Sequence, residues 1–169
     1  MRENSLISRV VNLSNKKVKI AIFGGRKAAE SLCHEADLVG RGIAERGWVL
    51  LCGGRGGIME AVSRACREAG GTVIGILPGE DDSDANPWVD ITIPTGIGFA
   101  RNAILAAACN AAVAIGGHYG TLSEIAYALH YQKPLIQLNS WNIPGSIPAE
   151  NAADVLQKLD VLINKKESL

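Results

Sequence analysis

The chain has 169 residues, 47% of them hydrophobic and 20% charged, which suits one globular domain over residues 1–169 and excludes a disordered or fibrous protein. Lys and Arg number 17 and Asp and Glu number 17, so the basic excess of a nucleic-acid-binding protein is missing and no nucleic-acid partner is expected. Residues 1–17 form a polar lead-in without the apolar core of a signal peptide, and no apolar run approaches the roughly 20 residues that cross a bilayer. We therefore expect a cytoplasmic protein that does not contact membranes.

Short apolar runs alternate with amphipathic stretches along the chain, and glycines stand between them. Strands are predicted at residues 18–23, 48–52, 72–77, 89–93, 111–115 and 134–138. Helices are predicted at residues 29–46, 58–69, 98–109, 121–131 and 149–163. Because parallel strands need crossover helices, this alternation predicts a Rossmann-like, doubly wound α/β domain. Its mostly parallel sheet has about six strands and carries helices on both faces.

Glycine-rich turns follow three of these strands, at the edge where such sheets bind ligands. Two of the turns, at residues 53–57 and 116–121, run directly into a predicted helix. The unpaired N–H groups and positive dipole of a helix N-terminus favour an anion, and glycine lets the backbone approach it closely. The predicted phosphate-binding residues are Gly24, Gly25, Gly53, Gly54, Gly57, Met59, Gly117, His118, Tyr119, Gly120 and Thr121.

The alternative is that these glycines form only tight turns and close helix–sheet contacts. We favour phosphate binding because two such loops lie at the same edge of the sheet. Neither loop contains the GxxxxGK[ST] pattern, and the first strand is not followed by GxGxxG, so the two commonest nucleotide-binding motifs are excluded.

Four segments resemble the LONELY GUY (LOG) family and its relatives, the molybdenum cofactor carrier proteins. They are GGRGGIME at 53–60, GGTVIGILP at 70–78, Arg101, and GGHYGTLSE at 116–124. They match the family's GGGxxGLM loop, GGxVIGxxP strand, Arg-Lys pair and PGGxGTxxE loop, in the same order, over about residues 23–138. Glu124 follows Arg101 by 23 residues, which is also the family's interval.

The resemblance implies a homodimer or homotetramer that binds a phosphorylated small molecule at the C-terminal edge of the sheet. In LOG enzymes the matching Arg and Glu hydrolyse the N-glycosidic bond of a nucleoside 5′-monophosphate and release free base and ribose 5-phosphate. No metal or organic cofactor is required, and Arg101 and Glu124 are the candidate catalytic residues. In the carrier proteins a related cleft holds molybdenum cofactor, a pterin phosphate. A carboxylate beside the sugar suits an oxocarbenium-like transition state; the alternative is an ordinary surface ion pair and helix-dipole partner.

Four positions depart from the LOG motifs. Asn102 replaces the Lys of the Arg-Lys pair, Gly116 and His118 change the PGG opening, and Ser123 replaces a carboxylate. These changes favour the carrier-like branch, and the alternative is a phosphoribohydrolase. The expected ligand is molybdenum cofactor or a nucleoside monophosphate, and no metal site is expected. Convergence of Arg101 and Glu124 within hydrogen-bond reach of a sugar-sized space would favour the enzyme.

Three further features leave alternatives open. The acidic segment at 80–84 can bind a divalent cation or form a solvated loop at the rim of the cleft; we favour the loop, which can close as a lid. Arg26 and Arg55 each follow a glycine turn and can line the cleft or lie on the surface. The small apolar residues at 103–109 fit against the sheet or a second subunit.

No lysine falls in a glycine loop, which excludes a pyridoxal phosphate-dependent lysine decarboxylase.

Overall fold

Seven strands form a single parallel sheet, and each is a short apolar run of the sequence. The computed structural model describes residues 16–167, so most of the predicted polar lead-in lies outside the described residues. The strands are β1 (Lys19–Gly24), β2 (Val49–Cys52), β3 (Thr72–Leu77), β4 (Ile91–Pro94), β5 (Ala111–Ile115), β6 (Leu135–Leu138) and β7 (Ile147–Ala149). Every residue of β2, β5 and β6 is buried, as expected for parallel strands covered on both faces.

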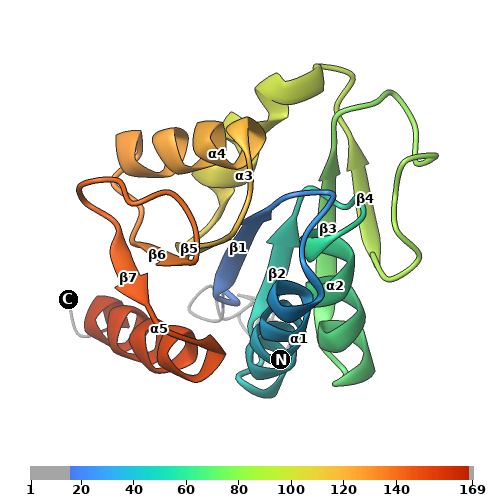
Figure 1. The fold of residues 1–169 in the computed structure, drawn as a ribbon. Helices are drawn as coiled ribbons and strands as arrows, with labels where there is room; N and C mark the ends of the chain where they lie inside the picture. Colours follow the sequence, from blue (N-terminus) through green and yellow to red (C-terminus); the bar gives the residue numbers. More distant parts are fainter. Residues whose placement is uncertain (1–15, 168–169) are drawn as a thin grey trace, which may run out of the picture.

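The helices cover the two faces of the sheet unequally. They are α1 (Glu30–Glu45), α2 (Ile58–Glu68), the 3-10 helix η2 (Gly98–Ala100), α3 (Arg101–Ala108), α4 (Tyr119–His130) and α5 (Ala152–Glu167). Helices α1, α2 and α5 lie on one side and α3 and α4 on the other (Figure 1). The two faces give two separate apolar clusters, one with Ile20, Val39 and Leu159, the other with Phe23, Leu105 and Ile125.

The order of the strands is β4-β3-β2-β1-β5-β6-β7. The chain starts at the centre with β1, moves outward to β4, and then returns through η2 and α3 to place β5 on the free side of β1. Ile20 of β1 is therefore paired with Leu50 of β2 and with Ala111 of β5. This architecture confirms the predicted Rossmann-like, doubly wound α/β fold with helices on both faces.

The sheet has seven strands rather than about six, because β7 was not predicted. This strand has three residues, pairs only with β6 and contains Pro148. Proline and the turn residues before it are typical of loops, and proline is tolerated only because β7 is an edge strand. The predicted C-terminal helix at 149–163 accordingly begins later, at Ala152.

Other boundaries move by a few residues. Helix α4 begins at Tyr119 rather than at residue 121, and the stretch at 98–109 divides into η2 and α3.

Among the described residues no helix combines the length and the apolar character needed to cross a bilayer. A cytoplasmic location stays a prediction.

Candidate functional site

A cavity of about 480 Å³ lies beyond the carboxyl ends of β1, β2 and β5. The loops after β1 and β5 leave the sheet in opposite directions at this point, which is where doubly wound sheets bind their ligands. The volume falls within the range of about 300–1,000 Å³ that is usual for small-molecule sites. Its lining residues are Gly24, Gly25, Arg26, Lys27, Arg55, Met59, Phe99, Arg101, Asn102, His118, Gly120, Thr121 and Glu124.

Most of the predicted site residues meet at this cavity. Of the thirteen named from the sequence, the following line it: Gly24, Gly25, Met59, Arg101, His118, Gly120, Thr121 and Glu124. Gly53, Gly54, Gly57 and Gly117 are absent from the lining and shape the loops behind it. Tyr119 points elsewhere: it is 81% exposed and its ring packs 6.1 Å from that of Trp141. A role for Tyr119 in ligand binding stays a prediction.

Gly57 holds the loops after β1 and β2 together. Its φ and ψ of 67° and −129° lie in a region that side-chain-bearing residues avoid. The next residue, Ile58, donates its N–H to the carbonyl of Gly25 at 3.1 Å. A Cβ on Gly57 would meet the backbone of Gly25 and Arg26, so only glycine allows the two loops to come this close.

The loop after β5 is fixed by its neighbours in a similar way. Gly117 has a φ of 99°, and a Cβ there would overlap the side chain of Thr121. Ser140 donates its hydroxyl to the carbonyl of Gly116 at 2.6 Å, and the indole of Trp141 donates to the carbonyl of His118 at 3.3 Å. The first turn of α4 therefore presents Gly120 and Thr121 to the cavity in a fixed orientation.

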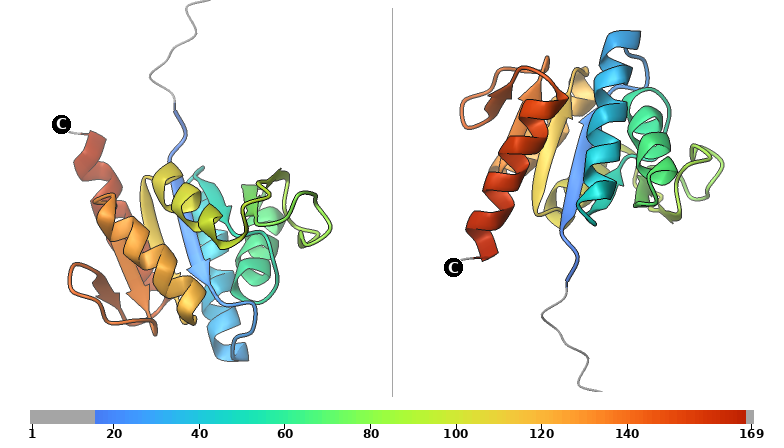
Figure 2. Two further views of the ribbon diagram at one scale, coloured as in Figure 1. Left: turned by 90° about the horizontal axis from the view of Figure 1, so that it is seen from above. Right: turned by 90° about the horizontal axis from the view of Figure 1, so that it is seen from below.

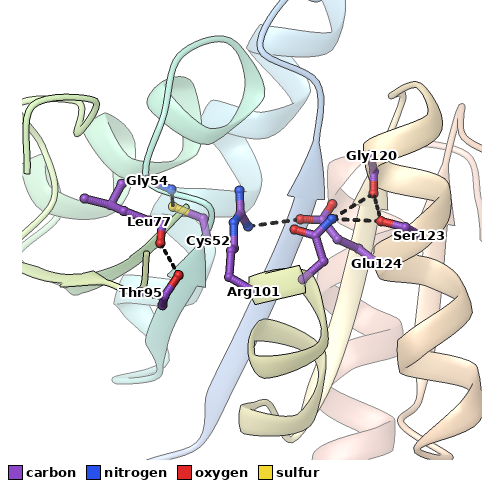
Figure 3. Close-up of polar contacts among 9 residues, drawn as sticks. Cys52, Gly54, Leu77, Thr95, Arg101, Gly120, Ser123 and Glu124 are labelled. Atoms are coloured by element: carbon purple, nitrogen blue, oxygen red, sulfur yellow. Dashed lines mark hydrogen bonds and ion pairs between the residues drawn. The ribbon is translucent and has the colours of Figure 1, made fainter. Parts of the chain in front are cut away.

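Arg101 and Glu124 converge at the inner wall of the cavity (Figure 3). The Nη1 of Arg101 donates to Oε1 of Glu124 at 3.3 Å, and each residue is only 5% exposed. Burial raises the pKa of Glu124 to about 8, even though the charge and hydrogen bond of Arg101 act in the opposite direction. Burial also lowers the pKa of Arg101. Arg101 and Glu124 thus form a buried, desolvated pair and not the surface ion pair that was the alternative.

The absence of a side chain at Gly53 makes room for Arg101. A Cβ on Gly53 would overlap the guanidinium of Arg101 and lie 2.7 Å from the sulfur of Met59. Arg101 begins α3, the helix through which the chain returns to the centre of the sheet. Its side chain therefore joins the loop after β2 to the helix after β5, across the cavity floor.

Asn102 stands where LOG enzymes carry a lysine, and its amide is held in one orientation. Ser123 donates its only hydroxyl proton to the carbonyl of Gly120 at 2.7 Å, so both groups can only accept from Asn102. The Nδ2 of Asn102 accordingly donates to Ser123 Oγ at 2.8 Å and to the Gly120 carbonyl at 3.4 Å. This leaves Oδ1 of Asn102 buried without a hydrogen-bond partner, and among residues 16–164 Nε of Arg101 is also buried and unpaired. Unpaired buried polar atoms of this kind cost about 1–3 kcal/mol each.

Positive charge predominates around the cavity. Arg26, Lys27, Arg55 and Arg101 line it, against the single carboxylate of Glu124. The sequence alone does not decide whether Arg26 and Arg55 line the cleft or lie on the surface. In the structure both line the cavity. Lys27 and Phe99 were not predicted as site residues. Lys27 could have been found from its place directly after the first glycine turn, whereas no local signal marks Phe99, which is 71% exposed.

The family model of the SLOG cluster4 family matches residues 17–167. The chain belongs to the SLOG cluster4 family. Its structure is similar to that of the molybdenum cofactor binding protein from Rippkaea orientalis, with a TM-score of 0.84 and 34% identity, covering 88% of this chain and 99% of the other. The molybdenum cofactor carrier protein of Chlamydomonas reinhardtii gives a TM-score of 0.81 and 35% identity, with the same two coverages.

A more distant relative of this SLOG cluster4 protein is an enzyme. The cytokinin riboside 5′-monophosphate phosphoribohydrolase of Mycobacterium marinum is 32% identical over 119 residues, which are 63% of this chain and 62% of the enzyme. The aligned part thus spans about three fifths of the enzyme's length. The resemblance to LOG enzymes and molybdenum cofactor carriers that the motifs indicated is therefore confirmed at the level of the family.

Proposed function

We propose that this protein binds a phosphorylated heterocycle in the cavity and acts as a carrier, with molybdenum cofactor as the leading ligand and a nucleoside monophosphate as the other candidate. The observation that carries the proposal is the charge of the cavity, where four cationic side chains face one carboxylate. That carboxylate is the one whose pKa burial raises to about 8, so the site at neutral pH is more positive than a count of ionisable residues suggests. An anionic ligand would neutralise it.

The lining also offers a place for each part of such a ligand. Gly120 and Thr121 in the first turn of α4 provide N–H groups and a hydroxyl for the phosphate. The exposed ring of Phe99 at the cavity offers an apolar face for a pterin or purine ring. The neighbouring molybdenum cofactor carrier structures at 34–35% identity support the choice of a pterin phosphate.

Equilibrium binding tests the proposal with molybdenum cofactor, AMP and adenosine as probes. We expect saturable binding of the cofactor and of AMP, much weaker binding of adenosine, and a loss of about tenfold or more in AMP affinity for Lys27→Ala, since a charge-assisted phosphate contact is worth about 1.5–3 kcal/mol. Lys17→Ala, which removes an exposed lysine that does not line the cavity, is the matched control. Equal affinity for AMP and adenosine would contradict a phosphate site.

A second function, hydrolysis of nucleoside 5′-monophosphates, is favoured by one observation: Arg101 and Glu124 do converge within 3.3 Å at a cavity large enough for a sugar. The departures from the LOG motifs at Asn102, Gly116 and His118 argue in the other direction, and the raised pKa of Glu124 suits a general acid as well as a structural carboxyl group. We therefore place the carrier first.

Release of free base from AMP and from isopentenyladenosine monophosphate separates the two functions. For a carrier we expect no release by the wild type and AMP binding that survives Glu124→Gln. Release that falls by about a hundredfold or more in Glu124→Gln would make the protein a phosphoribohydrolase, because general acid–base and electrostatic groups contribute rate factors of about 10²–10⁴.

We also propose that the protein is a homodimer or homotetramer that associates through α3 and α4. Ile104 and Tyr127 on these helices and Tyr131 at the end of α4 expose between 36% and 43% of their surface. Light scattering in solution is expected to give two or four times the chain mass of 17.8 kDa. Ile104→Asp should dissociate the assembly, whereas Leu38→Asp on α1, a leucine of the same 43% exposure, should not. A monomeric wild type would contradict this proposal.

A further inference from the structure

The acidic segment between β3 and β4 reaches the cavity through one ion pair. The segment projects beside the edge of the sheet (Figure 2), and Oδ2 of Asp84 lies 2.7 Å from Nη2 of Arg55. The two side chains differ in their surroundings: that of Arg55 is 18% exposed and lines the cavity, whereas that of Asp84 is 50% exposed. Within residues 16–167, the carboxylate that pairs with Arg55 therefore comes from a loop and not from the cavity wall.

Asn86 holds the acidic segment against the second glycine loop. Its backbone N–H donates to the carbonyl of Gly54 at 2.8 Å, and its Nδ2 donates to the carbonyl of Arg55 at 3.0 Å. Its Oδ1 accepts from the N–H of Trp88 at 3.0 Å, and the residue is only 8% exposed. Asp84 is thus kept close to Arg55 by an anchor two residues away, and does not depend on the ion pair to stay there.

A carboxylate beside Arg55 has the same chemistry as the ligand that the cavity is proposed to bind. Guanidinium groups pair with carboxylate and phosphate oxygens in the same geometry. An anionic ligand that uses Arg55 must therefore displace Asp84 or share the guanidinium with it. An exposed carboxylate is a weak partner, with an interaction of about 0.2–1 kcal/mol. A phosphoryl dianion can therefore displace Asp84 from Arg55, whereas an anion of lower charge displaces it less effectively.

We infer that Asp84 is an internal competitor for Arg55 that sets the affinity and charge selectivity of the cavity for phosphate-bearing ligands. This inference rests on the proposed phosphate-binding function and adds a residue outside the cavity lining to it. Asp84 acts through Arg55 and does not itself contact the ligand. It also gives the acidic segment a role other than that of a cation site or a closing lid.

Isothermal titration of AMP, inorganic phosphate and adenosine into Asp84→Asn tests this role. We expect AMP and phosphate to bind about two- to fivefold more tightly than to the wild type, the range that corresponds to an exposed ion pair. The affinity for adenosine, which lacks the phosphate, should not change. Asp82→Asn is the matched control, because it removes the same charge from the same segment without touching Arg55, and it should change the AMP affinity by less than about 1.5-fold, as expected for a solvated charge screened by salt.

A double-mutant cycle with Arg55→Gln completes the test. Arg55→Gln should weaken AMP binding, and adding Asp84→Asn to it should then have no further effect. Weaker AMP binding in Asp84→Asn would show that Asp84 positions Arg55 for the ligand and would overturn the inference, as would equal effects of Asp82→Asn and Asp84→Asn. If the wild type bound inorganic phosphate but not AMP, the proposed heterocycle carrier would be refuted, and the competition between Asp84 and phosphate could still be measured. If no variant bound either anion, the proposed function and the inference about Asp84 would both be refuted.

Discussion

Gly57→Ala is expected to lower the free energy of unfolding by about 3 kcal/mol and to abolish ligand binding. Two costs add: a left-handed, glycine-only backbone conformation costs about 1–3 kcal/mol, and overpacking costs about 1–3 kcal/mol more. The overpacking is unavoidable because the new Cβ would meet the backbone of Gly25 and Arg26 and not a movable side chain. Separation of the loops after β1 and β2 would open one wall of the cavity.

Gly70→Ala is the matched control for this substitution. Gly70 also has a positive φ, of 79°, but a Cβ there meets nothing within 4 Å. It follows α2 as a helix-ending glycine, so alanine should cost only the conformational strain, about 1 kcal/mol, and leave binding intact. Urea unfolding of both variants, with AMP titration, measures the difference. Equal losses in the two variants would show that the contact between the loops contributes nothing.

The stability of the wild type is expected to fall as the pH rises from about 5 to about 8. Glu124 has an ordinary pKa of 4.5, and burial raises its pKa in the folded protein to about 8. Between these values the folded state holds a proton that the unfolded state has lost, so the free energy of unfolding decreases with pH. With about 1.4 kcal/mol for each pKa unit, the loss is on the order of a few kcal/mol. The lowered pKa values of Asp154 and Asp160 act only below their ordinary value of 3.8, outside this window.

Glu124→Gln should remove this dependence, because glutamine resembles the protonated carboxyl group and does not titrate. The variant and the wild type should unfold alike at pH 5, and the variant should be the more stable of the two at pH 8. Glu68→Gln, on the exposed side of α2, is the control and should keep the wild-type dependence. Urea midpoints at pH 5, 6, 7 and 8 measure the effect. A wild type that is as stable at pH 8 as at pH 5 would mean that Glu124 is ionised in the folded protein.

The sequence carries most of the information about the fold. Short apolar runs such as β5, bounded by glycines, favour buried parallel strands, and six of the seven strands were predicted within about two residues of their positions. The exception, β7, is specified by pairing with β6 and not by its own composition, because a three-residue edge strand with Pro148 has the local pattern of a loop. Pairing between distant segments leaves no local signal.

The site is less completely specified by the sequence. The family resemblance paired Arg101 with Glu124, and the structure brings them within 3.3 Å of each other because α3, which begins at Arg101, carries the chain back to the centre of the sheet beside α4. The resemblance did not show that both are buried, since burial depends on how Gly53 and the returning chain close over Arg101. Phe99 was missed for a related reason: it lies in a 3-10 turn that reaches the cavity only because α3 crosses back to the centre of the sheet.

The crossing of the chain at the centre of the sheet couples ligand occupancy to folding. The cavity wall is assembled from segments that follow β1, β2 and β5, between about residues 24 and 124, so no partly unfolded chain retains it. A ligand held there stabilises only the native state, by about 2.7 kcal/mol when its concentration is a hundred times its dissociation constant. The loaded protein would accordingly outlast the empty one wherever proteases remove unfolded chains, and the level of the protein would follow the supply of its ligand.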